Sequence, residues 1–280
     1  AIREIMLRRR LEESSARERE QKAIIEANHK ELTSSIRYSQ RMQEAILPGE
    51  AALLQLFPAA FALQRPKDIV SGDFLWCTEI DGRRYVAVAD CTGHGVPGAL
   101  MSMLGYSLLN KIVLGGGLRD TARILTRLRE EVIAAQKHRD GDEATDGMDI
   151  ALCMIDPATG EMEFAGAFSP AVLVRDGQRI DFAADRMPVG SLGTETLPAF
   201  TARRIAIQPG DMLYLFSDGY PDQFGGPNDR KFGRTRFLEM LTRLAPNTPA
   251  EQRPQLSSAL QLWQRDCPAV DDVLVVGMRL

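Results

Sequence analysis

The sequence VADCTGHGVPGA, residues 88–99, decides the fold of this chain. Its apolar start predicts a strand that ends near Asp90, and its glycine-rich centre predicts a turn into an apolar helix. A side chain at the polar end of a strand can point off the rim of a sheet toward its neighbours. Three further motifs place acidic residues at the ends of apolar runs in the same way, at Asp73, at Asp218 and at the Asp271-Asp272 pair. The four motifs together indicate one shared site.

Carboxylates gathered at one rim need positive charge, because like charges repel one another unless a cation lies between them. Hard divalent cations such as Mg²⁺ and Mn²⁺ prefer carboxylate and water oxygens, so they are the expected ligands. The alternative is that each aspartate only caps a strand or a turn, as aspartate beside glycine often does. Repetition of the pattern in four motifs favours the metal site.

The composition is that of a globular protein, since 44% of the 280 residues are hydrophobic. A net charge of −4 offers no basic surface for nucleic acid, so nucleic acid is not an expected partner. The cysteines stand far apart and indicate a reducing cytosol. They are Cys77, Cys91, Cys153 and Cys267. We find neither a signal-peptide pattern nor an apolar run that approaches bilayer length, and we expect a cytoplasmic chain that forms part of a longer protein.

Residues 1–47 contain no glycine or proline and predict one long helix, which Pro48-Gly49 ends. This change predicts a helical signalling linker over residues 1–48 and a globular domain over residues 49–280. Spacings of three and four are typical of a coiled-coil seam, here formed by Ile25, Asn28, Leu32, Ser35, Ser39, Met42 and Ile46. We expect either a homodimer through residues 1–47 or packing of this stripe on the chain's own domain. Arg8-Arg9-Arg10 would suit an anionic membrane surface or solvent.

The rest of the chain alternates short strands with helices, which predicts antiparallel sheets flanked by helices in an α+β fold. The predicted strands span residues 57–63, 74–80, 85–89, 148–155, 162–165, 171–174, 180–182, 202–207, 212–216 and 273–278. The predicted helices span residues 99–114, 118–136, 234–244 and 254–265.

Two familiar motifs lack the context that their usual functions need. Residues 93–98 form a G-x-G-x-x-G, but Asp90 would place a negative charge beside a bound pyrophosphate. Cys77 and Arg83 have the spacing of a cysteine phosphatase loop, but acidic residues and a hairpin turn lie between them, and these would repel phosphate. We therefore expect Cys77 to be an ordinary strand residue.

Four motifs in this order resemble those of the PPM (PP2C-like) serine/threonine phosphatases, and within them the bacterial SpoIIE/RsbU branch. They are RPKDIVSGDF at residues 65–74, VADCTGHGVPGA at residues 88–99, FSDG at residues 216–219 and DDV at residues 271–273. The resemblance covers residues 50–280 and implies a four-layer αββα sandwich with two divalent metal ions at one rim. The preceding helix is similar to the linker of SiaA-type sensor phosphatases, which implies the cytosolic part of an inner-membrane sensor protein.

The resemblance also implies roles for individual residues. The implied metal ligands are Asp73, Asp90, the carbonyl of Cys91, Asp218 and Asp271. Asp90 resembles the carboxylate that bridges both ions. Asp272 is the alternative to Asp271, because adjacent strand residues point to opposite faces and only one can face the metals. Ser71 and Cys91 stand where this branch more often has glycine.

These ligands imply that metal-bound water hydrolyses a phosphate monoester, without a nucleophile from the protein. The expected substrate is phosphoserine or phosphothreonine of a small regulatory protein, of anti-sigma-factor-antagonist type, in a bacterial signalling switch. His94 either protonates the leaving oxygen or only orders the glycine-rich turn. Arg65 and Lys67 either meet the substrate phosphate or lie in solvent. The alternative function is a silent phosphatase-fold scaffold, against which the intact carboxylates argue.

Overall fold

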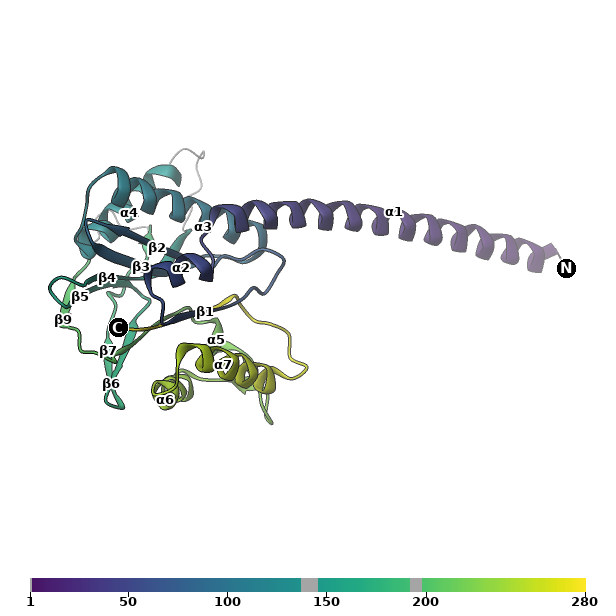
Figure 1. The fold of residues 1–280 in the computed structure, drawn as a ribbon. Helices are drawn as coiled ribbons and strands as arrows, with labels where there is room; N and C mark the ends of the chain where they lie inside the picture. The colour runs from purple at the N-terminus through teal and green to yellow at the C-terminus, as the bar shows by residue number, and fades with distance from the viewer. Residues whose placement is uncertain (1, 137–145, 192–197) are drawn as a thin grey trace. The chain divides into compact units, whose positions relative to one another are not determined.

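The computed structural model describes residues 2–136, 146–191 and 198–280 (Figure 1). The chain divides into two compact units, Ala1–Met42 and Gln43–Leu280. Helix α1 (Ile2–Ile46) is continuous across this division, so its last residues belong to the second unit. The change in sequence composition predicts the boundary slightly later, at the proline and glycine that end the helix.

Two antiparallel sheets form the centre of the second unit (Figure 1). Sheet A has the strand order β1-β13-β10-β6-β7, and sheet B has the order β2-β3-β4-β5-β9 with β8 beside β4. Sheet A contains β1 (Ala60–Arg65), β6 (Ala171–Arg175), β7 (Gln178–Phe182), β10 (Met212–Phe216) and β13 (Val273–Arg279). Sheet B contains β2 (Phe74–Ile80), β3 (Arg83–Cys91), β4 (Gly147–Asp156), β5 (Glu161–Ala167), β8 (Val189–Gly190) and β9 (Arg203–Ala206). The short strands β11 (Phe224–Gly225) and β12 (Arg230–Lys231) pair with each other.

Helices cover the outer face of each sheet, and this layering confirms the predicted αββα sandwich (Figure 1). Sheet B is covered by α3 (Gly95–Asn110), the π-helical turn η1 (Lys111–Gly115) and α4 (Thr121–Gln136). Sheet A is covered by α6 (Arg234–Leu244) and α7 (Pro249–Gln264). The short helices α2 (Glu50–Leu56) and α5 (Gly219–Asp222) complete the described elements.

Strand alternation explains how one chain fills three apolar layers. In β3, Val86 and Val88 pack between the sheets, whereas Ala87 and Ala89 pack against the helices outside sheet B. In β10, Leu215 lies between the sheets and Tyr214 packs against the helices outside sheet A. Both faces of each sheet are therefore buried, which is why these strands read as continuous apolar runs.

One apolar run proves longer than the sequence analysis expected. Among the described residues, Gly95–Gly115 is a helical stretch long and apolar enough to cross a membrane. Its inner face packs Leu108, Leu109 and Ile112 into the layer outside sheet B, so its hydrophobicity is used in the core of the sandwich.

Several element starts differ from the sequence prediction, and those of β1 and α7 have identifiable reasons. β1 begins at Ala60 and not at residue 57, because Phe57 is the C-cap of α2, a helix that the sequence analysis missed. α7 begins at Pro249, since proline is favoured in a first helical turn. A capping box supports this start, with the Glu251 carboxylate accepting bonds from the Thr248 N–H at 2.9 Å and from its hydroxyl at 2.8 Å.

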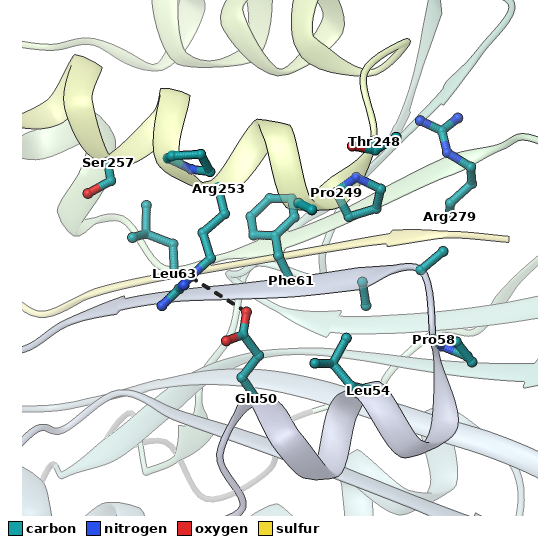
Figure 2. Close-up of a pocket in the computed structure, with 14 residues that line it drawn as sticks. Glu50, Leu54, Pro58, Phe61, Leu63, Thr248, Pro249, Arg253, Ser257 and Arg279 are labelled. Atoms are coloured by element: carbon teal, nitrogen blue, oxygen red, sulfur yellow. Dashed lines mark ion pairs between the residues drawn. The ribbon is translucent and has the colours of Figure 1, made fainter.

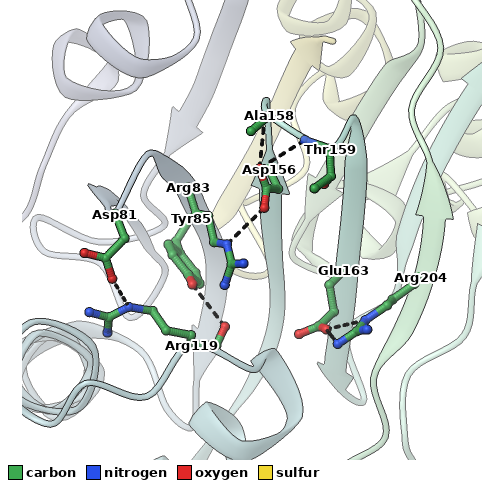
Figure 3. A network of polar contacts seen from close by, with 9 residues as sticks. All are labelled: Asp81, Arg83, Tyr85, Arg119, Asp156, Ala158, Thr159, Glu163 and Arg204. Carbon is green, nitrogen blue, oxygen red and sulfur yellow. Dashed lines mark hydrogen bonds and ion pairs between the residues drawn. The ribbon is translucent and has the colours of Figure 1, made fainter.

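Ion pairs close the end of sheet B that lies away from Asp90 (Figure 3). Arg83 pairs with Asp156 at 3.0 Å, and Arg119 pairs with Asp81 at 2.8 Å. Nearby, Glu163 is buried, pairs with Arg204 at 2.7 Å and accepts the N–H of Thr121 at the start of α4 at 2.7 Å. Each of these arginines has a carboxylate partner, so this end is a satisfied structural network.

Candidate metal centre and active site

Strand register brings the predicted carboxylates to one rim between the sheets. Asp90, near the end of β3, pairs directly with Asp149 at the start of β4. Their strand neighbours Ala89, Cys91, Met148 and Ile150 pack outward against the helices. Alternation therefore directs Asp90 and Asp149 to the side that faces sheet A.

The other predicted carboxylates reach the same rim from neighbouring strands. Asp73 immediately precedes β2, whose Phe74 pairs with Ala89 beside Asp90. Asp218 follows β10, and Asp271 and Asp272 precede β13, its neighbour in sheet A. The structure thus assembles acids from five separate segments of the chain.

Burial and mutual repulsion raise the pKa values of this cluster. Burial, followed by the charges of Asp218, Asp271 and Asp149, raises the pKa of Asp90 to about 8. Burial, followed by Asp218, raises the pKa of Asp149 to about 6. The pKa of Asp218 is raised by burial and then by Asp222 and Asp271. These groups act on one another, and the positive charge of Lys231 only partly offsets this at Asp218.

Asp73 is the most deeply placed of these acids, with 1% of its surface exposed. Its pKa is raised well above the usual value by burial and then by Asp90, against the opposing effect of a hydrogen bond. The donor is the hydroxyl of Ser217, 2.6 Å from Asp73 Oδ2. The same Ser217 oxygen accepts the N–H of Leu274 at 2.9 Å. Asp73, which leads into sheet B, is therefore linked through Ser217 to β10 and β13 of sheet A.

Asp149 is a site residue that the sequence analysis missed. The signal was present, because Asp149 is an acidic side chain at the start of an otherwise apolar strand, the same pattern that selected Asp90. Only the pairing of β3 with β4 makes the two residues neighbours, and pairing between distant strands cannot be read from the spacing of residues.

The structure distinguishes the two adjacent acids that the sequence left as alternatives. Asp272 is buried, and both of its carboxylate oxygens are occupied: Oδ1 accepts the N–H of Lys67 at 2.8 Å and Oδ2 accepts the N–H of Gly72 at 2.7 Å. Asp271 instead acts electrostatically on Asp90 and Asp218. Asp272 therefore holds a loop, and Asp271 remains the expected metal ligand.

Gln43 of α1 holds the other side of the loop that ends at Asp73. Its side-chain nitrogen donates to the carbonyl of Ser71 at 2.6 Å and to the hydroxyl of Ser102 at 2.9 Å. Its side-chain oxygen accepts the N–H of Ser71 at 3.2 Å. This buried amide thus clamps the main chain two residues before Asp73, and the sequence analysis had assigned no role to it.

The glycine-rich turn after Asp90 allows close backbone packing. A Cβ atom on Gly98 would collide with the carbonyl oxygen of Gly93 and lie 3.1 Å from the Cα of Gly72. The glycines of the G-x-G-x-x-G pattern therefore let α3 approach the loop before Asp73. This packing role agrees with the conclusion that the pattern is not a dinucleotide-binding motif.

His94 caps the start of α3 and is oriented by an acid that the sequence analysis did not single out. Its Nδ1 lies 2.7 Å from Asp68 Oδ2, and 55% of its side chain is exposed. The imidazole can therefore reach a substrate at the rim while Asp68 fixes the ring. Both predicted roles, proton donor and turn-ordering group, stay open for His94.

Three predicted site residues remain, and they lie differently with respect to the carboxylates: Arg65, Lys67 and Cys91. Arg65 is the last residue of β1, and the backbone N–H of Lys67 donates a hydrogen bond to Asp272. Among the residues that the structure describes, neither side chain forms an ion pair, so both cations are free to meet an anion. The Cys91 thiol is buried and points toward the outer helices, which leaves its carbonyl as the only ligand atom it could offer.

Cys77 has the surroundings of a structural residue. It lies inside β2 opposite Val86 and away from the rim. Burial raises the pKa of its thiol to about 11, so almost no thiolate forms at neutral pH. The prediction that it is an ordinary strand residue is consistent with both observations.

The largest cavity described, about 870 Å³, lies away from the carboxylates, between α2, β1 and α7 (Figure 2). There Glu50 accepts the N–H of Ala62 and Arg253 donates to the carbonyl of Ala62, both at 3.1 Å. The two side chains pair at 3.5 Å and cover the free edge of β1. This arrangement protects an edge strand, and it offers no group suited to phosphate hydrolysis.

Comparison with known proteins establishes the family. The family model described as Stage II sporulation protein E (SpoIIE) matches residues 80–280. The chain belongs to the SpoIIE family. The resemblance to the SpoIIE/RsbU branch of PPM phosphatases is thereby confirmed.

Solved structures of SpoIIE-family and PP2C-like domains share the fold. The PP2C domain of SiaA from Pseudomonas aeruginosa has 30% sequence identity and a TM-score of 0.82, over 91% of this chain and 99% of that one. The phosphatase domain of SpoIIE from Bacillus subtilis, with a regulatory fragment, has 23% identity and a TM-score of 0.64, over 79% and 61%. RsbX in complex with magnesium has 13% identity and a TM-score of 0.54, over 79% and 94%. No curated protein sequence matches the chain.

The carboxylates at the rim between the two sheets offer the kind of ligand that divalent metal ions prefer. Burial followed by mutual repulsion raises the pKa values of Asp73 and Asp90. Within the described ranges, no three side chains of Asp, Glu, His or Cys lie close enough together to form a preassembled metal site. Asp73, Asp90, Asp218 and Asp271 are the side chains that would hold metal.

The metal-free SpoIIE-family domain should lose stability as pH rises from 5 to 8. The unfolded chain releases the Asp90 proton near pH 4, whereas the folded protein keeps it until about pH 8, so the folded state binds more protons in this window. We expect Asp90→Asn to remove its share of this slope, while Asp73, Asp149 and Asp218 keep theirs, and to stabilise the metal-free protein by about 1–4 kcal/mol at pH 8. Urea unfolding in EDTA at several pH values measures both quantities.

The exposed turn residue Asp176 provides the matched control for this experiment. Asp176→Asn removes the same charge far from the rim and should leave the slope unchanged. An equal pH slope in the wild type and in Asp90→Asn would contradict the assignment of the raised pKa to Asp90.

Proposed function

We propose that the chain is a metal-dependent phosphatase that removes phosphate from phosphoserine or phosphothreonine of a small regulatory protein. The observation that carries this proposal is the convergence of buried acids from five chain segments, with pKa values raised by burial and then by mutual repulsion, in a SpoIIE-family domain. The magnesium complex of RsbX supports Mg²⁺ or Mn²⁺ as the cofactor, and we propose two ions.

The metal ions would supply a water activated at neutral pH and positive charge against the phosphoryl oxygens. The chain's own residues prepare the site for them. Ser217 fixes the carboxylate of Asp73, and Asp272 and Gln43 hold the loop before it from two sides. We assign His94, oriented by Asp68, to the protonation of the leaving oxygen.

Phosphate release from a phosphorylated candidate protein, in Mn²⁺, Mg²⁺ or EDTA, tests this function. We expect turnover with either metal and none in EDTA. A silent scaffold would bind the phosphorylated partner with equal affinity in all three conditions and release no phosphate. That result would replace the phosphatase proposal with the scaffold alternative.

The relatives support a place in bacterial signalling, since SpoIIE is a determinant of cell fate. We propose that the substrate is of the anti-sigma-factor-antagonist type. We further propose that the domain acts in the cytoplasm and that α1 connects it to an upstream membrane sensor.

We propose that α1 makes the chain a homodimer. The apolar seam residues Ile25, Leu32 and Met42 are 66%, 61% and 45% exposed, so each is available to a second helix. A chain beginning at Met42 keeps the Gln43 clamp and should be monomeric by sedimentation, with altered phosphatase activity. Asn28→Leu in the full chain should tighten association, because it replaces a polar seam residue by an apolar one. Equal masses and equal rates for both chain lengths would contradict the proposal.

A further inference from the structure

We propose that Phe168 and Arg234 form a docking surface for the substrate segment beside the phosphorylated residue, with an apolar side chain on Phe168 and an acidic side chain at Arg234. This inference rests on the proposed phosphatase function and adds the sequence preference of its substrate. We call the two residues, with the cavity next to them, the docking surface.

Strand pairing places Phe168 next to the carboxylates. Ala167 ends β5 opposite Ile150 of β4, so Phe168 follows at the level of Asp149. The next residue, Ser169, donates its hydroxyl to the carbonyl of Phe216 at 3.3 Å, and this joins the segment to the strand that leads to Asp218. Phe168 therefore lies at the rim between two of the acids.

Phe168 combines an exposed ring with a strained backbone. Its φ is 51°, a left-handed conformation that is costly for a bulky residue, and 46% of its surface is exposed. Three of the other non-glycine residues with positive φ are aspartates, which tolerate this conformation. The hydrogen bond from the Phe168 N–H to the Asp185 carbonyl, 2.9 Å long, holds the strained segment in place. The exposed part of the Phe168 ring is available to contact a bound peptide.

Arg234 supplies a cation from the neighbouring helix. It is the first residue of α6, where the helix dipole disfavours positive charge. Its guanidinium lies 5.9 Å from the centre of the Phe216 ring, two residues before Asp218. Within the described ranges Arg234 has no carboxylate partner, so its charge is available to an acidic side chain of a ligand.

A cavity of about 310 Å³ lies beside Arg234 and beside the chain that follows Phe168. Its wall includes Pro170 and Ala171, which directly follow the Phe168 segment, and Arg234 and Leu238 of α6. Its lining combines apolar residues with polar and charged ones. Arg179 pairs with Asp181 at 2.9 Å, which leaves Arg234 as the cation of the lining without a carboxylate partner among the described residues. This chemistry is complementary to an extended peptide that carries both apolar and acidic residues.

Synthetic phosphoserine peptides test the docking surface with the full chain and Mn²⁺. One peptide carries leucine and glutamate next to phosphoserine, and a second carries alanine and glutamine at these positions. We expect Phe168→Asn to lower kcat/KM for the first peptide about tenfold and Arg234→Gln to lower it about threefold. Neither variant should change kcat/KM for the second peptide or for p-nitrophenyl phosphate.

Thermal unfolding distinguishes a role of Phe168 in substrate docking from a role in the stability of the fold. Asparagine tolerates a positive φ better than phenylalanine, so Phe168→Asn should raise the thermal midpoint while it weakens peptide hydrolysis. Phe168→Tyr keeps the ring and should keep the wild-type rate. The matched controls Leu262→Ala and Arg123→Gln alter an exposed apolar residue and an exposed arginine elsewhere, and should have no effect.

Each outcome decides between the two proposals. Equal kcat/KM values of the wild type and Phe168→Asn for the leucine peptide, with p-nitrophenyl phosphate still hydrolysed, would overturn the docking surface alone. Equal loss on p-nitrophenyl phosphate would show that Phe168 only maintains the rim, which also overturns it. No hydrolysis of any substrate by the wild type with Mn²⁺ would instead overturn the proposed function.

Discussion

Asp90→Ala is expected to lower phosphate release by about 10³-fold or more while the protein stays folded. Asp90 lies at the centre of the carboxylate cluster, where Asp73, Asp149, Asp218 and Asp271 all interact with it. Its removal would take away the proposed bridging ligand and the activated water together. Above about pH 8, where Asp90 is ionised in the metal-free protein, removal of its buried charge also relieves repulsion, so the metal-free variant should there unfold at higher denaturant than the wild type.

Measurement of phosphate release at saturating Mn²⁺, with circular dichroism to check the fold, decides this prediction. Cys77→Ser is the matched control, because the Cys77 thiol lies in β2 and burial raises its pKa to about 11. It should keep nearly the wild-type rate. A folded Asp90→Ala protein with near wild-type turnover would refute the metal centre, and loss of turnover in Cys77→Ser would favour a cysteine nucleophile.

The neighbours Asp271 and Asp272 should give different results in stability and similar results in activity. Asp271→Ala removes a proposed metal ligand and should abolish most turnover with little change in the free energy of unfolding. Asp272→Ala leaves the buried N–H of Gly72 and the partly buried N–H of Lys67 without acceptors, at a cost of about 2–5 kcal/mol. Its activity should fall because the loop before Asp73 loosens.

Mn²⁺ affinity and urea unfolding measured on both variants test this separation. Asp271→Asn and Asp272→Asn provide isosteric partners, of which only Asp272→Asn should recover part of the lost stability, since its amide oxygen can accept one of the two bonds. If Asp271→Ala proves as destabilised as Asp272→Ala and still binds Mn²⁺ with wild-type affinity, the assignment of the two acids is reversed.

The sequence was sufficient for the layers of the fold because both faces of each strand are buried, and this leaves continuous apolar runs such as β10 and β13. Asp73, Asp90 and Asp218 were visible for the same reason, as acids at the ends of these runs. Short elements such as α2 and β8 carry too few residues for a clear periodicity.

The residues that the sequence could not supply act across long separations. Asp149 becomes a site residue through pairing with β3, and Asp68 through its contact with His94. Asp272 and Gln43 act on a loop that lies far from each of them in the chain. No local pattern records such contacts, since tertiary packing alone decides which strand ends meet.

The hydrogen bonds of Gln43 fix the rotation of α1 about its own axis, and with it the direction from which any preceding segment joins this domain. Because α1 runs without a break through Gln43, each residue added or removed within the helix turns everything upstream by about 100° around the helix axis. Upstream segments can therefore be exchanged between proteins only when they join in the same helical register. A segment that precedes this domain along α1 is thus constrained in its rotational setting about the helix axis, because Gln43 is bonded to the loop before Asp73.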